Sequence, residues 1–83
     1  MTLDYIKDRF KIGDRLVIQF TTVSGTKEMC HITLENFKPD YALGEGIGFW
    51  CHGYAGGYRS NICVKEIEFI GYDYDEVDVL INI

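Results

Sequence analysis

The chain has 83 residues, which is enough for one domain with a small hydrophobic core. Hydrophobic residues make up 47% of it and charged residues 25%, with one proline, which excludes a disordered tail, a collagen-like chain and a coiled coil. No apolar run approaches the roughly 18 residues of a membrane-spanning helix. Because the start of the sequence has no basic and apolar stretch of the secretory kind, we expect a cytoplasmic protein that does not bind membranes.

The net charge of −5, from thirteen acidic and eight basic residues, is unevenly distributed. Lys65 is the last basic residue, and six acidic residues follow it. Negative charge at this end opposes binding to nucleic-acid phosphates and attracts a partner with a basic surface. The alternative is that these charges only keep an exposed strand edge in solution.

The first expected element is a short helix over residues 2–10. Thr2 is a suitable N-cap, and Leu3, Ile6 and Phe10 have the spacing of one apolar helix face. A glycine and an aspartate then end the element. This pattern predicts one amphipathic helix that packs its apolar face against the rest of the domain.

A long β-hairpin over residues 15–37 is expected next, with its turn at Gly25. The apolar period changes here from that of a helix to two, which is typical of half-buried strands. The residues expected to face the core are Leu16, Ile18, Phe20, Cys30, Ile32 and Leu34. Met29, His31 and Thr33 then face outward from the second strand of the hairpin.

The remaining strands are expected within residues 47–83. A third strand over 47–52 turns Cys51 inward and Trp50 outward, and a fourth strand runs over 59–70. In the fourth strand the alternation of apolar residues shifts by one position, so that Ile62 and Val64 point to one face and Ile67 and Phe69 to the other. A β-bulge near Lys65 and Glu66 would bring both pairs to the same face. After a turn, a fifth strand faces inward with Val77, Val79, Ile81 and Ile83.

One short helix followed by five short antiparallel strands is too little chain for a two-sheet sandwich. We therefore expect a mainly β, single-domain fold over residues 1–83, in which the strands curl into a small, partly open barrel. The long first hairpin and the bulged fourth strand resemble an SH3-like barrel, and an OB-like barrel is the alternative.

Three cysteines and two histidines include the dipeptides Cys30–His31 and Cys51–His52, which in number could hold zinc. Neighbouring residues on a strand point to opposite faces, so a thiol and the adjacent imidazole cannot both reach one ion. We expect reduced cysteines packed in the core, with the imidazoles in solvent. With no catalytic triad, paired carboxylates or cofactor motif, the sequence indicates no metal, no cofactor and no enzyme activity.

Two surfaces are candidates for binding a partner. If residues 26–37 pair with the third strand, residues of types enriched at interfaces gather on or near one outer face. These are Met29, His31, Trp50, His52, Tyr54, Tyr58 and Arg59. The alternative is that the N-terminal helix covers this face. The second candidate is the acidic and aromatic C-terminal edge, formed by Tyr72, Asp73, Tyr74, Asp75, Glu76 and Asp78.

The favoured interpretation is a non-enzymatic module that binds another protein with a basic surface. Its specific form is a small acidic inhibitor or regulator of a nucleic-acid-processing protein, by analogy with the small acidic anti-defence proteins of phages. A nucleic-acid-binding barrel is an alternative that the net charge disfavours. A small-ligand site would use His31, His52, Cys51 and Tyr58. Exposed strand edges are also compatible with a homodimer.

Overall fold

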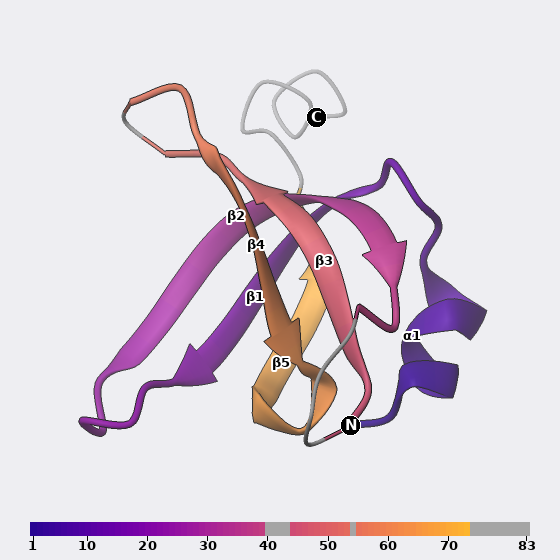
Figure 1. The fold of residues 1–83 in the computed structure, drawn as a ribbon, viewed down its shortest axis with the longest axis horizontal. Helices are drawn as coiled ribbons and strands as arrows, with labels where there is room; N and C mark the ends of the chain where they lie inside the picture. The colour runs from indigo at the N-terminus through magenta and orange to yellow at the C-terminus, as the bar shows by residue number, and fades with distance from the viewer. Residues whose placement is uncertain (40–43, 54, 74–83) are drawn as a thin grey trace, which may run out of the picture.

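A computed structural model describes residues 1–39, 44–53 and 55–73 of the chain (Figure 1). These residues form one helix, five strands and one 3₁₀ helix. In chain order they are α1 (Leu3–Arg9), β1 (Arg15–Thr21), β2 (Lys27–Phe37), β3 (Gly46–Cys51), β4 (Tyr58–Cys63), η1 (Val64–Glu66) and β5 (Ile67–Tyr72). The expected mainly β fold with a short N-terminal helix is confirmed.

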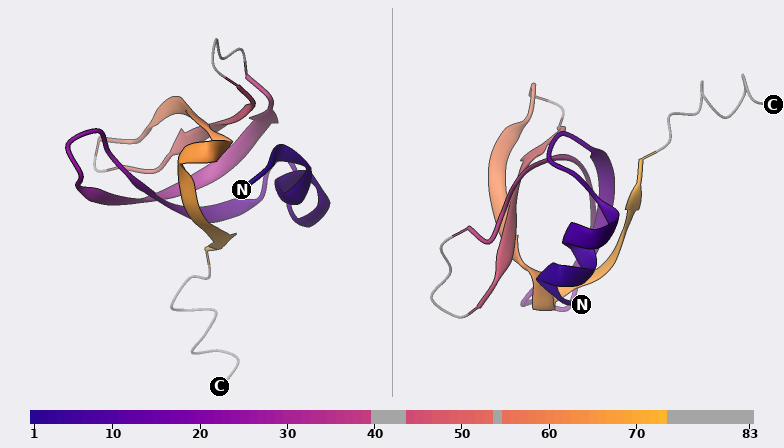
Figure 2. Two further views of the ribbon diagram at one scale, coloured as in Figure 1. Left: turned by 90° about the horizontal axis from the view of Figure 1, so that it is seen from below. Right: turned by 90° about the vertical axis from the view of Figure 1, so that its right-hand side faces the viewer.

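All five strands belong to one antiparallel sheet with the order β4-β3-β2-β1-β5. The sheet is strongly curled but does not close, and α1 lies at one end of it (Figure 2). This arrangement confirms the expected small, partly open barrel. Among the described residues, no helix is long and apolar enough to cross a membrane.

The expected fourth strand is in fact two strands, β4 and β5, separated by η1. β4 pairs with β3, whereas β5 pairs with β1 at the opposite edge of the sheet. A β-bulge adds one residue but keeps the same partner strand, so the predicted bulge at Lys65 and Glu66 is wrong. The short 3₁₀ turn, closed by a hydrogen bond from the Ile67 N–H to the Val64 carbonyl, lets the chain change partners. The expected strand over residues 77–83 lies outside the described residues.

A one-residue shift does occur in β5, at Glu68. Phe20 pairs with Ile67, but the preceding residue on β1, Gln19, pairs with Phe69. The extra residue turns Phe69 outward, where it is 51% exposed, and Ile70 is buried in its place. The expectation that Phe69 belongs to the core is therefore wrong.

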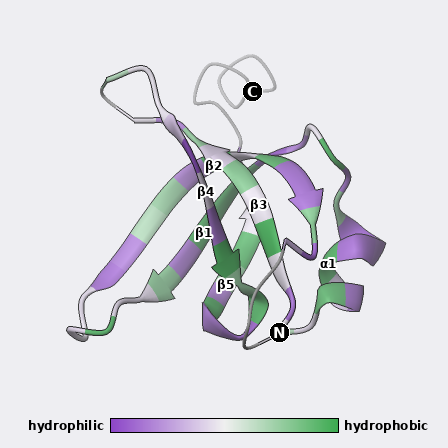
Figure 3. Cartoon of the chain, in the orientation of Figure 1, coloured by the Kyte–Doolittle hydropathy of each residue, from purple (hydrophilic) through white to green (hydrophobic). Residues whose placement is uncertain are grey.

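The hydrophobic core lies on the concave side of the sheet, and the alternation expected for β1 and β2 is confirmed. Along these two strands the buried positions are separated by more exposed ones, and the buried positions are apolar (Figure 3). On β3 every residue except Trp50 is buried, and Cys51 faces the core as expected. The largest fully buried side chains are Ile6, Leu16, Ile18, Ile32, Leu34 and Ile47. One of these six comes from α1, so the helix is part of the core.

The helix covers the concave side of the sheet and not its outer face. The Thr2 hydroxyl caps the helix by accepting a hydrogen bond of 3.2 Å from the Tyr5 N–H. At the other end, the Tyr72 hydroxyl donates to the Arg9 carbonyl at 3.0 Å, and its ring packs edge-on against Phe10. The alternative in which α1 shields the outer face is therefore excluded.

The position of α1 predicts unequal effects of two substitutions within one helix. Ile6→Ala removes a fully buried side chain and should lower the free energy of unfolding by about 3 kcal/mol. Asp8→Ala, on the exposed side of α1, should change it by no more than about 0.5 kcal/mol. Urea unfolding measures both, and equal effects would contradict the placement of the helix.

Candidate binding face of the sheet

The side of the sheet opposite the core is called here the outer face, and strand register aligns its side chains in rows. On β2, Thr33 pairs with Arg15 of β1 and with Trp50 of β3, and Trp50 pairs in turn with Arg59 of β4. These four residues form one row across four strands. The sequence predicts a shared outer face only if residues 26–37 pair with the third strand. This pairing is present, because β2 pairs with β3.

The next row contains both histidines. The His52 N–H donates a 2.8 Å hydrogen bond to the His31 carbonyl, and His31 pairs with Val17 of β1. Met29 lies one row further along β2, opposite Gln19. The structure therefore places Met29, His31, Trp50 and His52 on one face, as the sequence indicates.

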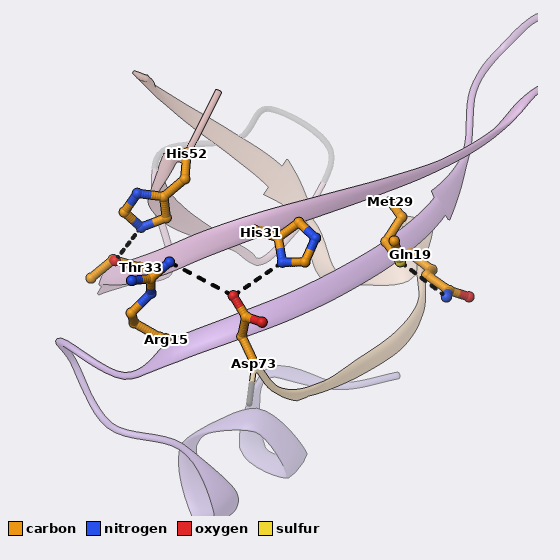
Figure 4. A network of polar contacts seen from close by, with 7 residues as sticks. All are labelled: Arg15, Gln19, Met29, His31, Thr33, His52 and Asp73. Carbon is orange, nitrogen blue, oxygen red and sulfur yellow. Dashed lines mark hydrogen bonds and ion pairs between the residues drawn. The ribbon is translucent and has the colours of Figure 1, made fainter. Parts of the chain in front are cut away.

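Asp73 connects side chains of β1 and β2 at one corner of the outer face (Figure 4). Its carboxylate lies 3.0 Å from His31 Nδ1 and 3.8 Å from Arg15 Nη2, and its side chain is only 15% exposed. The Asp73 N–H also donates to the Arg15 carbonyl, which extends the pairing of β5 with β1 by one residue. Asp73, a predicted partner-binding residue, thus contacts both His31 and Arg15 on this face.

The two imidazoles have different partners. His52 Nε2 lies 2.7 Å from the Thr33 hydroxyl, whereas His31 contacts Asp73 (Figure 4). Across the described residues, no three side chains of histidine, cysteine, aspartate or glutamate are grouped so that they could hold a metal ion. The histidines are therefore surface groups, each oriented by one neighbour.

Trp50 is half-buried and held on two sides. The Arg59 guanidinium carbon lies 5.9 Å from the Trp50 ring centroid, and Arg59 is itself bound to the Glu35 carboxylate at 3.1 Å. On the other side the indole lies against Gly57, where an added Cβ would come within 2.6 Å of Nε1. Trp50 is thus held by contacts within the chain. The role of Glu35 is one that sequence reasoning missed.

Two exposed apolar side chains flank Gln19 on the outer face. Met29 on β2 is 55% exposed and Phe69 on β5 is 51% exposed. The Phe69 ring lies over Gly71, since a Cβ at Gly71 would be 2.9 Å from it. Phe69 was missed by the sequence reasoning because parity along the strand assigned it to the core. A shallow hollow of about 250 Å³ lies beside Gln19 and Met29.

Several other predicted residues do not contribute to this face. Tyr58 pairs with Cys51, which puts it on the concave side of the sheet, and Tyr72 packs against the end of α1. Arg59, in contrast, lies on the outer face. The predicted residues outside the described part of the chain are Tyr54, Tyr74, Asp75, Glu76 and Asp78.

Cys30 and Cys51 face the core side, as expected, whereas Cys63 pairs with Gly46 and points to the opposite side of the sheet from the core residue Ile62. Cys51 is buried, and Cys30 is half-buried and packs against the hydrophobic core. Burial raises the pKa of the Cys30 thiol to about 11, and the Cys51 thiol and the Glu28 carboxylate add to this rise. A hydrogen bond to Cys51 likewise raises the pKa of the Tyr58 hydroxyl.

Comparisons with known proteins add no further guide to function. No family model, no curated protein and no solved structure matches this chain. The functional argument therefore depends on the geometry described above.

The raised pKa of Cys30 predicts slow alkylation. Because the pKa rises from 9.0 to about 11, the thiolate fraction at pH 8 falls by about 100-fold, and the rate with iodoacetamide should fall with it. Peptide mapping by mass spectrometry measures the rate at each cysteine. The same protein unfolded in urea is the control, and equal rates at Cys30 in both states would contradict the described environment.

Proposed function

We propose that this protein is a non-enzymatic module that binds another protein through the outer face of its sheet. The observation that carries the proposal is that α1 packs on the concave side and leaves the outer face uncovered, with Met29 and Phe69 about half exposed on it. Exposed methionine and aromatic side chains near one another are characteristic of interaction surfaces.

The surroundings of these apolar residues support the same proposal. Trp50 and Arg59 are residue types that dominate binding energies, and both are already positioned by neighbours. Arg15 and His31 are similarly oriented by Asp73. Side chains that are ordered before binding lose less conformational entropy on association, which favours affinity.

The charge distribution supports a partner with a basic surface. Of the thirteen acidic residues, four lie outside the described part of the chain, at positions 40, 75, 76 and 78, which leaves nine acids and eight bases within it. Three of those four follow directly after Asp73, which is anchored at the corner of the outer face. We therefore propose a regulator or inhibitor of a basic protein, such as one that processes nucleic acids.

Direct nucleic-acid binding has less support. Such barrels use exposed aromatic residues beside an excess of basic ones. The described residues have no excess of bases, and Arg15 and Arg59 are both engaged with carboxylates. Retention of single strands on a filter at low salt would favour this alternative.

Substitutions on the outer face should weaken partner binding. Met29→Glu places a charge where the proposed contact is apolar and should weaken binding at least about tenfold. Ile12→Glu is the matched control, because Ile12 is 52% exposed but lies in the connection between α1 and β1. Affinity capture from the native host identifies the partner, and calorimetry with the purified partner then gives both affinities. Equal losses, or no loss with Met29→Glu, would contradict the proposal.

The acidic residues should act mainly on the association rate. If Asp75, Glu76 and Asp78 steer a basic partner, raising the salt concentration should slow association while changing dissociation little. The variant in which these three become Asn, Gln and Asn should associate more slowly at low salt and show a flatter salt dependence. Surface plasmon resonance measures both rates. A salt dependence unchanged by neutralisation would show that the acidic residues play no part.

A further inference from the structure

The Met29 sulfur on the outer face is both exposed and hydrogen-bonded. Met29 is 55% exposed on β2 and pairs with Gln19 of β1. The Gln19 side-chain amide donates a hydrogen bond of 3.7 Å from Nε2 to the Met29 sulfur (Figure 4). Both residues line the shallow hollow of about 250 Å³ described above. A small oxidant can therefore reach this sulfur from solvent.

A thioether in this position has a defined reaction with a peroxide. Its sulfur has two lone pairs, and the Gln19 amide engages one of them. The other lone pair attacks one peroxide oxygen, so that an S–O bond forms as the O–O bond breaks. For hydrogen peroxide, the departing hydroxide takes the remaining proton and leaves as water. The sulfur loses two electrons to the peroxide, and the product is methionine sulfoxide, which methionine sulfoxide reductases convert back to methionine.

This reaction would change what the outer face presents to a partner. Met29 and Phe69 flank Gln19 in one row across three strands, and both are about half exposed. The thioether is apolar, whereas the sulfoxide is polar and carries a strong hydrogen-bond acceptor. Covering that oxygen with an apolar partner surface leaves it without a donor, which costs free energy on binding.

We propose that Met29 is a reversible peroxide-oxidation site that weakens partner binding when it is oxidised, and that Gln19 is the residue that positions its sulfur. This inference rests on the function proposed above, because the effect requires a partner that covers the outer face. The oxidant is a peroxide, and the reaction takes place in the free protein, where Met29 is exposed.

The two core cysteines are less accessible to the same oxidant. Cys51 is 6% exposed, and Cys30 packs against the hydrophobic core. Burial also raises the pKa of the Cys30 thiol to about 11, so little of the reactive thiolate is present at neutral pH. Met1, which is 41% exposed, supplies a second accessible methionine in the same chain for comparison.

The first test needs no partner. The full chain is treated with hydrogen peroxide, and peptide mapping follows sulfoxide at each methionine before and after treatment with the A-type or the B-type reductase, each of which accepts one sulfoxide diastereomer. Because the hydrogen bond from Gln19 occupies one lone pair, Met29 should give one diastereomer in at least about twofold excess. Met1 should give both in nearly equal amounts.

The variant Gln19→Glu is the matched control for this measurement. It keeps the size of the side chain and removes the amide donor, so the two diastereomers at Met29 should become nearly equal. An equal mixture in the unmodified chain, or an excess that persists in Gln19→Glu, would overturn the proposal.

The second test measures partner binding before and after oxidation. After peroxide treatment and reduction of the thiols with dithiothreitol, calorimetry should show at least about tenfold weaker binding, and the reductases should restore it. Met29→Leu has no sulfur to oxidise at this position, so its own affinity should be the same before and after the treatment. An equal loss in Met29→Leu would overturn the proposal.

The oxidation site and the proposed binding face can fail separately. Unchanged affinity after complete oxidation of Met29, while Met29→Glu still weakens binding, would overturn the oxidation site and leave the binding face intact. No loss of affinity with Met29→Glu would contradict the binding face itself, and the oxidation site with it.

Discussion

The pairing of β2 with β3 in one fixed register is the constraint on which the rest of the structure depends. It places Ile32 opposite Cys51 toward the core and Thr33 opposite Trp50 toward the outside. Because side chains alternate along a strand, a slip of one residue would exchange every inward group for an outward one. Such a slip would bury His31 and expose the apolar residues of two strands, at a cost that a core of this size could not offset.

The composition of both sides of the sheet follows from this one register. On the concave side it turns Cys30 and Cys51 toward the hydrophobic core. On the other side it aligns His31 and Trp50 in rows with residues of the neighbouring strands. Asp73 contacts His31, and Arg59 contacts Trp50. The hydrophobic core and the face proposed for protein recognition thereby lie on opposite sides of one sheet.

Local periodicity explains what the sequence could predict. The helix and the first hairpin depend on contacts between residues close in the chain, so spacing alone located them and correctly assigned Cys30 inward and His31 outward. The exchange of partner strands at η1 depends on contacts between distant residues, which parity does not encode. The same limit explains why Phe69 was assigned to the core, and why Tyr58 was grouped with a face it does not join.

The most direct test of the register compares two neighbouring substitutions to the same residue. Cys51→Asp buries a carboxylate without a partner and should lower the free energy of unfolding by more than about 3 kcal/mol. His52→Asp places the same group in solvent and should change it by less than about 1 kcal/mol. Urea unfolding of both variants gives the comparison. Equal losses, or a larger loss for His52→Asp, would contradict the inside–outside arrangement of β3.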